Sequence, residues 1–270
     1  MPHDGNSVAN TDNPILAVRG LIAEIVLNAP DRKNALSLSA WERIPERLHE
    51  LTANPEVRVC VIRGAGGKSF CAGADISEFK AIRSTPEAAM RYDAVNVAAF
   101  KALKNVAIPV IAAIEGPCLG GGLGLALACD LRIASQTALF GIPAARLGLA
   151  YPPDALSDLL EAVSPSDAKK VLFTGERFSA ESALQMGLIN EVLTPNALEA
   201  RIEALCNAIC ANAPLSVRAA KQAVNNLSGN TAKTTLESDR LNARNCIDST
   251  DYSEGCRAFL EKRLPVFSGR

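Results

Sequence analysis

The fold is decided by the stretch Gly116-Pro117-Cys118-Leu119-Gly120-Gly121-Gly122-Leu123-Gly124. It follows the β-prone run Pro109–Ile114 and continues into an Ala-rich stretch ending at Cys129, which predicts a strand, a tight turn and the start of a helix. Glycines at such a turn let a ligand approach the main chain, and the first helical amides point at that ligand. Close helix packing is the alternative explanation for the glycines. The phosphate-loop pattern Gly-x-x-x-x-Gly-Lys-Ser/Thr is absent.

A second turn of this kind lies earlier in the chain. Its sequence is Ser69-Phe70-Cys71-Ala72-Gly73-Ala74-Asp75-Ile76, and it follows the apolar strand Val57–Arg63 and the glycine-rich turn Gly64–Lys68. Two such turns, each placed after a buried strand, predict a ligand site built from main-chain groups rather than from charged side chains.

Strands and helices alternate along most of the chain. Ile15–Val18 and Leu21–Leu27 flank Arg19-Gly20 and predict a β-hairpin. From Ser37, apolar residues recur every three or four positions, which predicts a helix that Pro45 either kinks or causes to start later. Repeated strand–helix–strand order favours an α/β fold of right-handed βαβ units.

The chain divides into three parts by pattern. Residues 1–13 are polar, lack the apolar core of a signal peptide and are expected to form a flexible tail. Residues 14–195 carry the α/β pattern. Residues 196–270 are predicted to be all-helical, and such a tail often docks on a partner or on its own core.

Composition excludes several classes of protein. The 270 residues carry 28 Lys and Arg against 29 Asp and Glu, whereas a general nucleic-acid binder normally has a basic surplus. With only two histidines, His3 and His49, His-based catalysis and His-rich metal sites are nearly excluded. The eight cysteines form no Cys-x-x-Cys pair, and we expect reduced thiols in a compartment such as the cytoplasm. No run reaches the roughly 18 apolar residues of a membrane span.

Taken together, the motifs resemble the crotonase (enoyl-CoA hydratase/isomerase) superfamily. The resemblance extends from about residue 15 to 267 and rests on matching stretches in the family's order, namely Asp31–Leu36, Phe70–Ile76, Pro109–Gly122, Cys129–Ala134, Phe140–Pro143, Phe173–Gly175 and Glu254–Arg263. It implies a crotonase-like spiral of ββα turns with a C-terminal α-helical trimerisation region. It also implies an acyl-CoA thioester substrate, no metal or redox cofactor, and a homotrimer or a hexamer made of two trimers.

The same resemblance assigns roles to residues. The backbone N–H groups of Ala74 and Gly121 would form an oxyanion hole, where preorganised donors stabilise the negative charge of a thioester enolate. Substrate-binding positions would include Lys33, Ala35, Ala72, Asp75 and Ile76 around the coenzyme A, with Phe259 and Lys262 reaching it, in some members from a neighbouring subunit. An ordinary exposed helix face, a solvated Lys33 and a structural Asp75 are the alternatives.

The sequence departs from the family pattern at the acids. Gly124 and Ala144 occupy the positions of the two usual catalytic glutamates, and Pro152 occupies that of an alternative acid. Asp154 is therefore a candidate acid or base, although an aspartate that caps the following helix is the alternative. Tyr151 is a candidate hydrogen-bond donor, with loop packing as its alternative.

These replacements leave the reaction open. Hydration is the hardest to run without the carboxylate pair, whereas decarboxylation or a single-acid isomerisation needs less acid–base help. A non-catalytic acyl-CoA-binding homologue is the second hypothesis, and a nucleotide-binding α/β protein is the third. The acyl group is not assigned from sequence.

Overall fold

The computed structural model describes residues 13–228 and 233–270. Its centre is a six-stranded sheet in the order β1-β2-β3-β4-β6-β9, in which only the β1–β2 hairpin is antiparallel. The strands are β1 (Ile15–Arg19), β2 (Ile22–Leu27), β3 (Val59–Gly64), β4 (Val110–Ile114), β6 (Leu131–Ser135) and β9 (Glu191–Leu193). The predicted α/β fold is confirmed.

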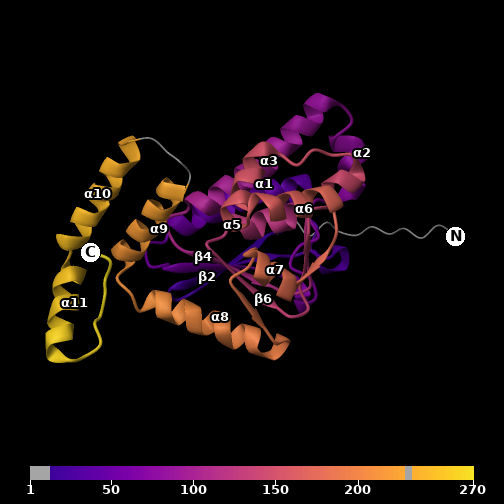
Figure 1. The fold of residues 1–270 in the computed structure, drawn as a ribbon. Coiled ribbons are helices and arrows are strands. Elements are labelled where there is room, and N and C mark those ends of the chain that lie inside the picture. Colours follow the sequence, from indigo (N-terminus) through magenta and orange to yellow (C-terminus); the bar gives the residue numbers. More distant parts are fainter. Residues whose placement is uncertain (1–12, 229–232) are drawn as a thin grey trace.

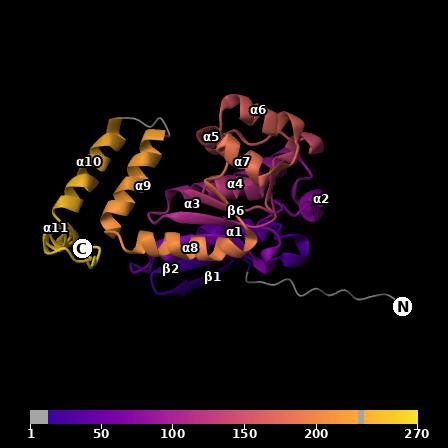
Figure 2. The same cartoon turned by 60° about the horizontal axis from the view of Figure 1, so that its bottom comes forward.

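A smaller sheet and a set of helices surround this centre (Figures 1 and 2). The second sheet has the order β5-β7-β8, with strands β5 (Pro117–Leu119), β7 (Leu139–Gly141) and β8 (Phe178–Ser179). The helices of the body are α1 (Leu38–Thr52), α2 (Phe79–Ile82), α3 (Pro86–Asn105), α4 (Gly121–Leu127), α5 (Pro153–Ala162), α6 (Pro165–Thr174), α7 (Ala180–Met186) and α8 (Pro195–Cys210). Short 3-10 turns cover Pro30–Arg32, Ala65–Gly67, Ile76–Glu78 and Pro143–Leu147.

The central strands β3 and β4 are buried on both faces over most of their length, so they read as continuous apolar runs. In β3, Cys60 and Ile62 point into the core that α1 and α3 cover, whereas Val59 and Val61 pack against α8 on the other side. The turns after the strands therefore lie at the carboxyl edge of a rigid layer.

Two local expectations need correction. The helix at Ser37 does not start late, since α1 begins at Leu38, with Ser37 capping the Ala40 N–H, and continues through Pro45. Asp154 is not a helix cap, because the N-cap of α5 is Pro152 and Asp154 lies inside the first turn.

The C-terminal helices form an arm that stands off the body (Figure 1). The arm comprises α9 (Pro214–Ser228), α10 (Lys233–Ile247) and α11 (Thr250–Glu261). With α8 these helices confirm the predicted helical character of residues 196–270 in their described part, except that the chain after Lys262 is not helical. The chain end folds back onto α11: Arg270 O accepts from the N–H groups of Thr250 and Asp251, at 2.8 and 3.3 Å. In residues 13–228 and 233–270, no helix is long and apolar enough to cross a bilayer.

Candidate active site

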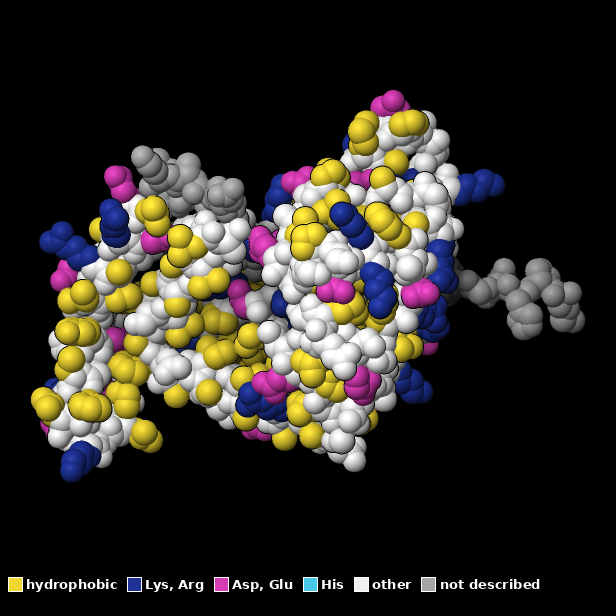
Figure 3. All heavy atoms as spheres, in the orientation of Figure 1, with side chains coloured by type: hydrophobic (Ala, Val, Ile, Leu, Met, Phe, Trp, Pro, Cys, Tyr) yellow, Lys and Arg dark blue, Asp and Glu magenta, His cyan; other side chains and the backbone are white. Residues whose placement is uncertain are grey.

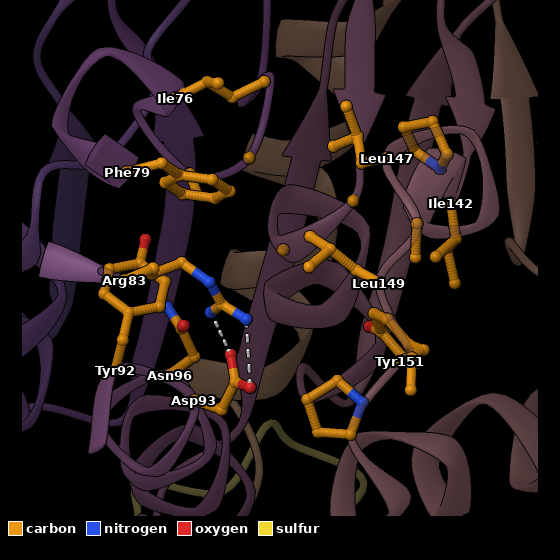
Figure 4. Close-up of a pocket in the computed structure, with 18 of the residues that line it drawn as sticks. Ile76, Phe79, Arg83, Tyr92, Asp93, Asn96, Ile142, Leu147, Leu149 and Tyr151 are labelled. Atoms are coloured by element: carbon orange, nitrogen blue, oxygen red, sulfur yellow. Dashed lines mark hydrogen bonds and ion pairs between the residues drawn. The ribbon is translucent and has the colours of Figure 1, made fainter. Parts of the chain in front are cut away.

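A cavity of about 130 Å³ lies between the two glycine-rich turns, the α2–α3 region and the loop before α5 (Figure 4). We call it the central cavity. Its walls are mostly apolar, and its lining includes Trp41, Ala72, Gly73, Ala74, Ile76, Phe79, Arg83, Tyr92, Asp93, Asn96, Phe100, Gly120, Gly121, Ile142, Pro143, Ala144, Leu147, Leu149, Ala150, Tyr151 and Pro152.

The two turns run side by side at one wall of the cavity. Cys71 N donates to Pro117 O at 3.0 Å, and Leu119 N donates to Cys71 O at 2.9 Å. A Cβ at Gly122 would lie only 2.3 Å from Cys71 O, so this close approach requires glycine. The triplet therefore serves packing at Gly122, while its neighbour Gly121 faces the cavity.

The two predicted oxyanion donors, Ala74 and Gly121, both line the central cavity. Their turns touch: a Cβ at Gly73 would lie 3.3 Å from the Gly121 N. Ala74 pairs with Leu36 in a short β-bridge, in which Leu36 N donates to Gly73 O and Asp75 N donates to Leu36 O. The Ala74 N–H takes no part in this bridge. Gly121 is the first residue of α4, where an amide has no intrahelical acceptor. Among the described residues, neither N–H has a hydrogen-bond partner.

The loop predicted to contact coenzyme A packs on the first turn. Ala72 N donates to Lys33 O at 3.0 Å, and Leu36 N donates to Gly73 O at 2.9 Å, so Lys33, Ala35 and Ala72 come together. Ala35 is buried beneath this contact.

Asp75 and Ile76 have different settings in that loop region. Asp75 is buried, caps the Ser77 N–H at 3.1 Å and pairs with Arg32. Burial alone would raise the pKa of Asp75, but the bonds from Ser77 and the Arg32 guanidinium hold that pKa below its usual range. Asp75 thus stiffens the turn as an ionised cap. Ile76 is half exposed at the cavity rim.

Aromatic groups fill the space beside Gly124. A Cβ there would lie 2.6 Å from Phe100 Cζ and 2.9 Å from the Tyr151 hydroxyl oxygen. That hydroxyl is buried without a partner among the described residues, and burial raises the pKa of Tyr151. Ala144, the other position where the resemblance expects a glutamate, lines the cavity with a methyl group.

Asp154 lies outside the central cavity. Its side chain is 58% exposed and pairs with the Lys101 Nζ at 2.9 Å. Among the described residues that line the cavity, the only acid is Asp93 and the only base is Arg83, and they pair with each other (Figure 4). This pair does not stand out in the sequence, because its only signal is an aspartate one turn before Asn96 of α3, which does not separate a cavity wall from a solvated face.

Phe259 and Lys262 are exposed on the arm and do not join the cavity of their own chain. Phe259 lies instead with Tyr252, Cys256 and Phe267 around a shallow hollow on α11.

The fold and site define an α/β protein in which two main-chain amides, unpaired within the described part of the chain, lie at the wall of a mostly apolar cavity. The chain belongs to the enoyl-CoA hydratase/isomerase family, whose model matches residues 18–270. It is thus an enzyme of a family that acts on acyl-CoA thioesters.

Individual relatives cover nearly the whole chain. The short-chain-enoyl-CoA hydratase of Clostridium acetobutylicum is 34% identical over 252 residues, 93% of this chain and 96% of the relative. The crotonyl-CoA hydratase of Syntrophomonas wolfei is 33% identical over 258 residues, 95% and 98% of the two chains. The crystal structure of an enoyl-CoA hydratase/carnithine racemase from Magnetospirillum magneticum superposes with a TM-score of 0.89 at 35% identity, covering 94% and 95%.

Proposed function

We propose that the enzyme binds an acyl-CoA thioester in the central cavity and stabilises its enolate with the N–H groups of Ala74 and Gly121. The observation that carries this proposal is the pair of unpartnered amides on touching turns. Negative charge develops on the thioester oxygen as the enolate forms, and fixed donors in a dry pocket bind that charge better than the neutral carbonyl. The donors are main-chain groups, so the proposal involves no metal or redox cofactor.

We further propose that the reaction is one that needs no carboxylate pair, namely decarboxylation of a malonyl-type CoA ester. The bond between the α-carbon and the carboxylate breaks, its electron pair passes into the enolate, and CO₂ leaves. The α-carbon then takes a proton from the Tyr151 hydroxyl, and the tyrosinate regains one from water. Burial raises the pKa of Tyr151, which favours a neutral donor over a base.

Hydration, the reaction in the names of the relatives, is a poorer fit to this cavity. It requires groups that hold a water and move its protons. The cavity offers a methyl group at Ala144 and aromatic rings beside Gly124, while Asp93 is engaged by Arg83. Separate turnover assays with malonyl-, enoyl- and dienoyl-CoA esters distinguish these reactions. Binding without any turnover would instead support a non-catalytic homologue.

A proline at Gly121 tests the oxyanion hole. Proline is tolerated at the first position of a helix and removes the N–H. Gly121→Ala is the matched control, because it adds the same Cβ, 3.0 Å from the Trp41 ring, and keeps the N–H. We expect kcat for Gly121→Pro to be about 100- to 1000-fold below that of Gly121→Ala. Equal rates in the two variants would show that this amide is not a donor.

We also propose a homotrimer, or a dimer of trimers, in which the arm of one subunit brings Phe259 and Lys262 to the coenzyme A of another. The support is that both residues are exposed on an arm that stands off the body (Figure 1), and neither lines the central cavity of its own chain.

A further inference from the structure

Among the described residues, the mostly apolar wall of the central cavity carries one charged pair. Arg83, which ends α2, donates two hydrogen bonds to the carboxylate of Asp93 on α3, one of them at 3.3 Å. Their side chains are 11% and 33% exposed, and both line the cavity. In Figure 4 the pair faces Leu149 and Tyr151 across the open space.

Arg83 is held in place by more than its ion pair. Its guanidinium carbon lies 5.2 Å from the ring centroid of Phe79 and 5.3 Å from that of Tyr92. Two of the five guanidinium N–H groups donate to Asp93, and the other three have no partner among the described residues. The Asp93 carboxylate in turn retains lone pairs. The wall thus offers fixed donors and acceptors side by side.

The position along α3 places this pair away from the reacting carbons. Phe100 packs beside Gly124, next to the oxyanion turn, and Asp93 lies seven residues earlier on the same helix. At 1.5 Å per residue the separation along the helix axis is about 10 Å. A thioester held by Ala74 and Gly121 would therefore meet Arg83 and Asp93 with a later part of its acyl chain.

The chemistry of the pair selects among acyl chains. A plain alkyl chain would cover the pair and remove water from it without replacing a hydrogen bond, which is unfavourable. A carboxylate on the acyl chain would be repelled by Asp93, because the charge of Asp93 already balances that of Arg83. A hydroxyl group both accepts from Arg83 and donates to Asp93, so it satisfies both partners without adding charge.

We propose that Arg83 and Asp93 form a specificity site for a hydroxyl group on the distal part of the acyl chain. The inference rests on the proposed function only in that the cavity holds the acyl group of a CoA ester. A purely structural role, in which the pair joins α2 to α3, is the competing explanation.

Calorimetry on the full chain tests the proposal without needing turnover. The ligands are saturated CoA esters of four, six and eight carbons, each with a terminal methyl, hydroxyl or carboxylate group. At one chain length or more, the hydroxyl ester should bind about tenfold more tightly than both counterparts, the gain typical of a well-placed hydrogen bond. If the methyl or the carboxylate ester binds as tightly as the hydroxyl ester at every chain length, the specificity site is ruled out, but the proposed function is not. No binding by any ester overturns the proposed function as well.

Two variants check that the pair causes the preference. Asp93→Asn keeps the shape and leaves the Arg83 charge unbalanced, so the carboxylate ester should gain at least tenfold in affinity relative to the methyl ester. Arg83→Met with Asp93→Leu replaces the pair by apolar groups and should make the methyl ester the tightest. The control is Arg201→Met with Glu191→Leu, which removes the ion pair between α8 and β9 away from the cavity. It should leave the hydroxyl preference intact. If the Arg83 and Asp93 variants change all affinities by the same factor, the pair is only structural.

Discussion

Tyr151 occupies the space beside Gly124, where the resemblance expects a glutamate side chain. Its hydroxyl oxygen lies 2.9 Å from the position that a Cβ at Gly124 would take. This oxygen is buried and has no hydrogen-bond partner among the described residues. We expect Tyr151→Phe to lower kcat by about 100-fold, the usual scale of one lost proton donor. The free energy of unfolding should stay unchanged or rise by up to about 1 kcal/mol, since no hydrogen bond of the folded protein is lost.

Steady-state rates and urea denaturation measure the two effects, with Tyr252→Phe on the arm as the control. Because burial raises the pKa of Tyr151, the hydroxyl stays neutral in the folded protein where a free tyrosine begins to ionise. The wild-type kcat should therefore not fall between about pH 8 and 10. An unchanged kcat in Tyr151→Phe would remove the residue from the mechanism.

Gly124 is a glycine for reasons of space. Its Cβ would meet Phe100 at 2.6 Å, so Gly124→Ala should destabilise the fold by about 1–3 kcal/mol through overpacking. Gly255 in α11 is the matched case, since its Cβ would lie 3.6 Å from Phe267, an ordinary contact. Gly255→Ala should be neutral or stabilise by about 0.4–1 kcal/mol. Urea denaturation compares the two, and equal effects would argue against the fit at Gly124.

The candidate site could be predicted from sequence only where main-chain groups form it. Ala74 and Gly121 do lie on touching turns at the cavity, because each follows a buried strand and strand order brings the turns together. Asp154 is close in sequence to the expected acid position, but the helix it enters directs it to Lys101 at the surface. Arg83 and Asp93 meet through the packing of α2 on α3, which no local pattern encodes.

At the scale of elements, Lys221 fixes the start of the arm to the body. Its Nζ, on α9, donates to Asp130 at 2.8 Å and to Ile108 O at 3.0 Å, and the side chain is only 7% exposed. Asp130 also accepts from the Val110 N–H at the start of β4. We expect Lys221→Met to cost about 3 kcal/mol, because it strands a carboxylate in a partly buried site.

The matched control is Lys101→Met. It breaks an exposed pair with Asp154 between α3 and α5 and should cost less than about 1 kcal/mol. Hydrogen exchange at the end of α9 would show whether the loss is local to this contact. Similar costs for the two lysines would contradict the docking role of Lys221.

Most helices and strands could be predicted from the spacing of apolar residues in the sequence. The patterns are strong for the largely buried strands β3 and β4, for the hairpin around Gly20 and for the long helix α8. The short strands β5, β8 and β9 have three residues or fewer and depend on pairing with distant partners, which a local pattern does not contain. Pro45 was misleading because the packing of Trp41, Ile44 and Leu48 outweighs one lost helical bond.

At the scale of the whole molecule, the arm carries apolar side chains that its own chain leaves uncovered (Figure 3). Leu260 and Leu264 are 81% and 88% exposed, beside the exposed Phe259 and Val266. Large exposed apolar groups of this kind mark association surfaces. We expect light scattering to give the mass of a trimer or hexamer, and Leu260→Asp with Leu264→Asp to give monomers.

Phe173 on α6 provides the control, since it is also apolar and exposed but lies on the body. Phe173→Asp should keep the mass of the wild type. A Leu260 and Leu264 variant that keeps that mass would show that the arm does not mediate assembly. Loss of turnover together with loss of assembly would agree with coenzyme A being held between subunits.

The fastening of the chain end to α11 has a mechanical consequence. Arg270 O is bonded to the first amides of α11, and Arg58 of the body donates to both Cys210 O and Phe267 O, each at 2.6 Å. These bonds would resist a force applied at the last residue before that force reached α11. The arm would then bear load as one unit anchored to the body through Lys221 and Arg58, and α11 would not unwind from its N-terminal end.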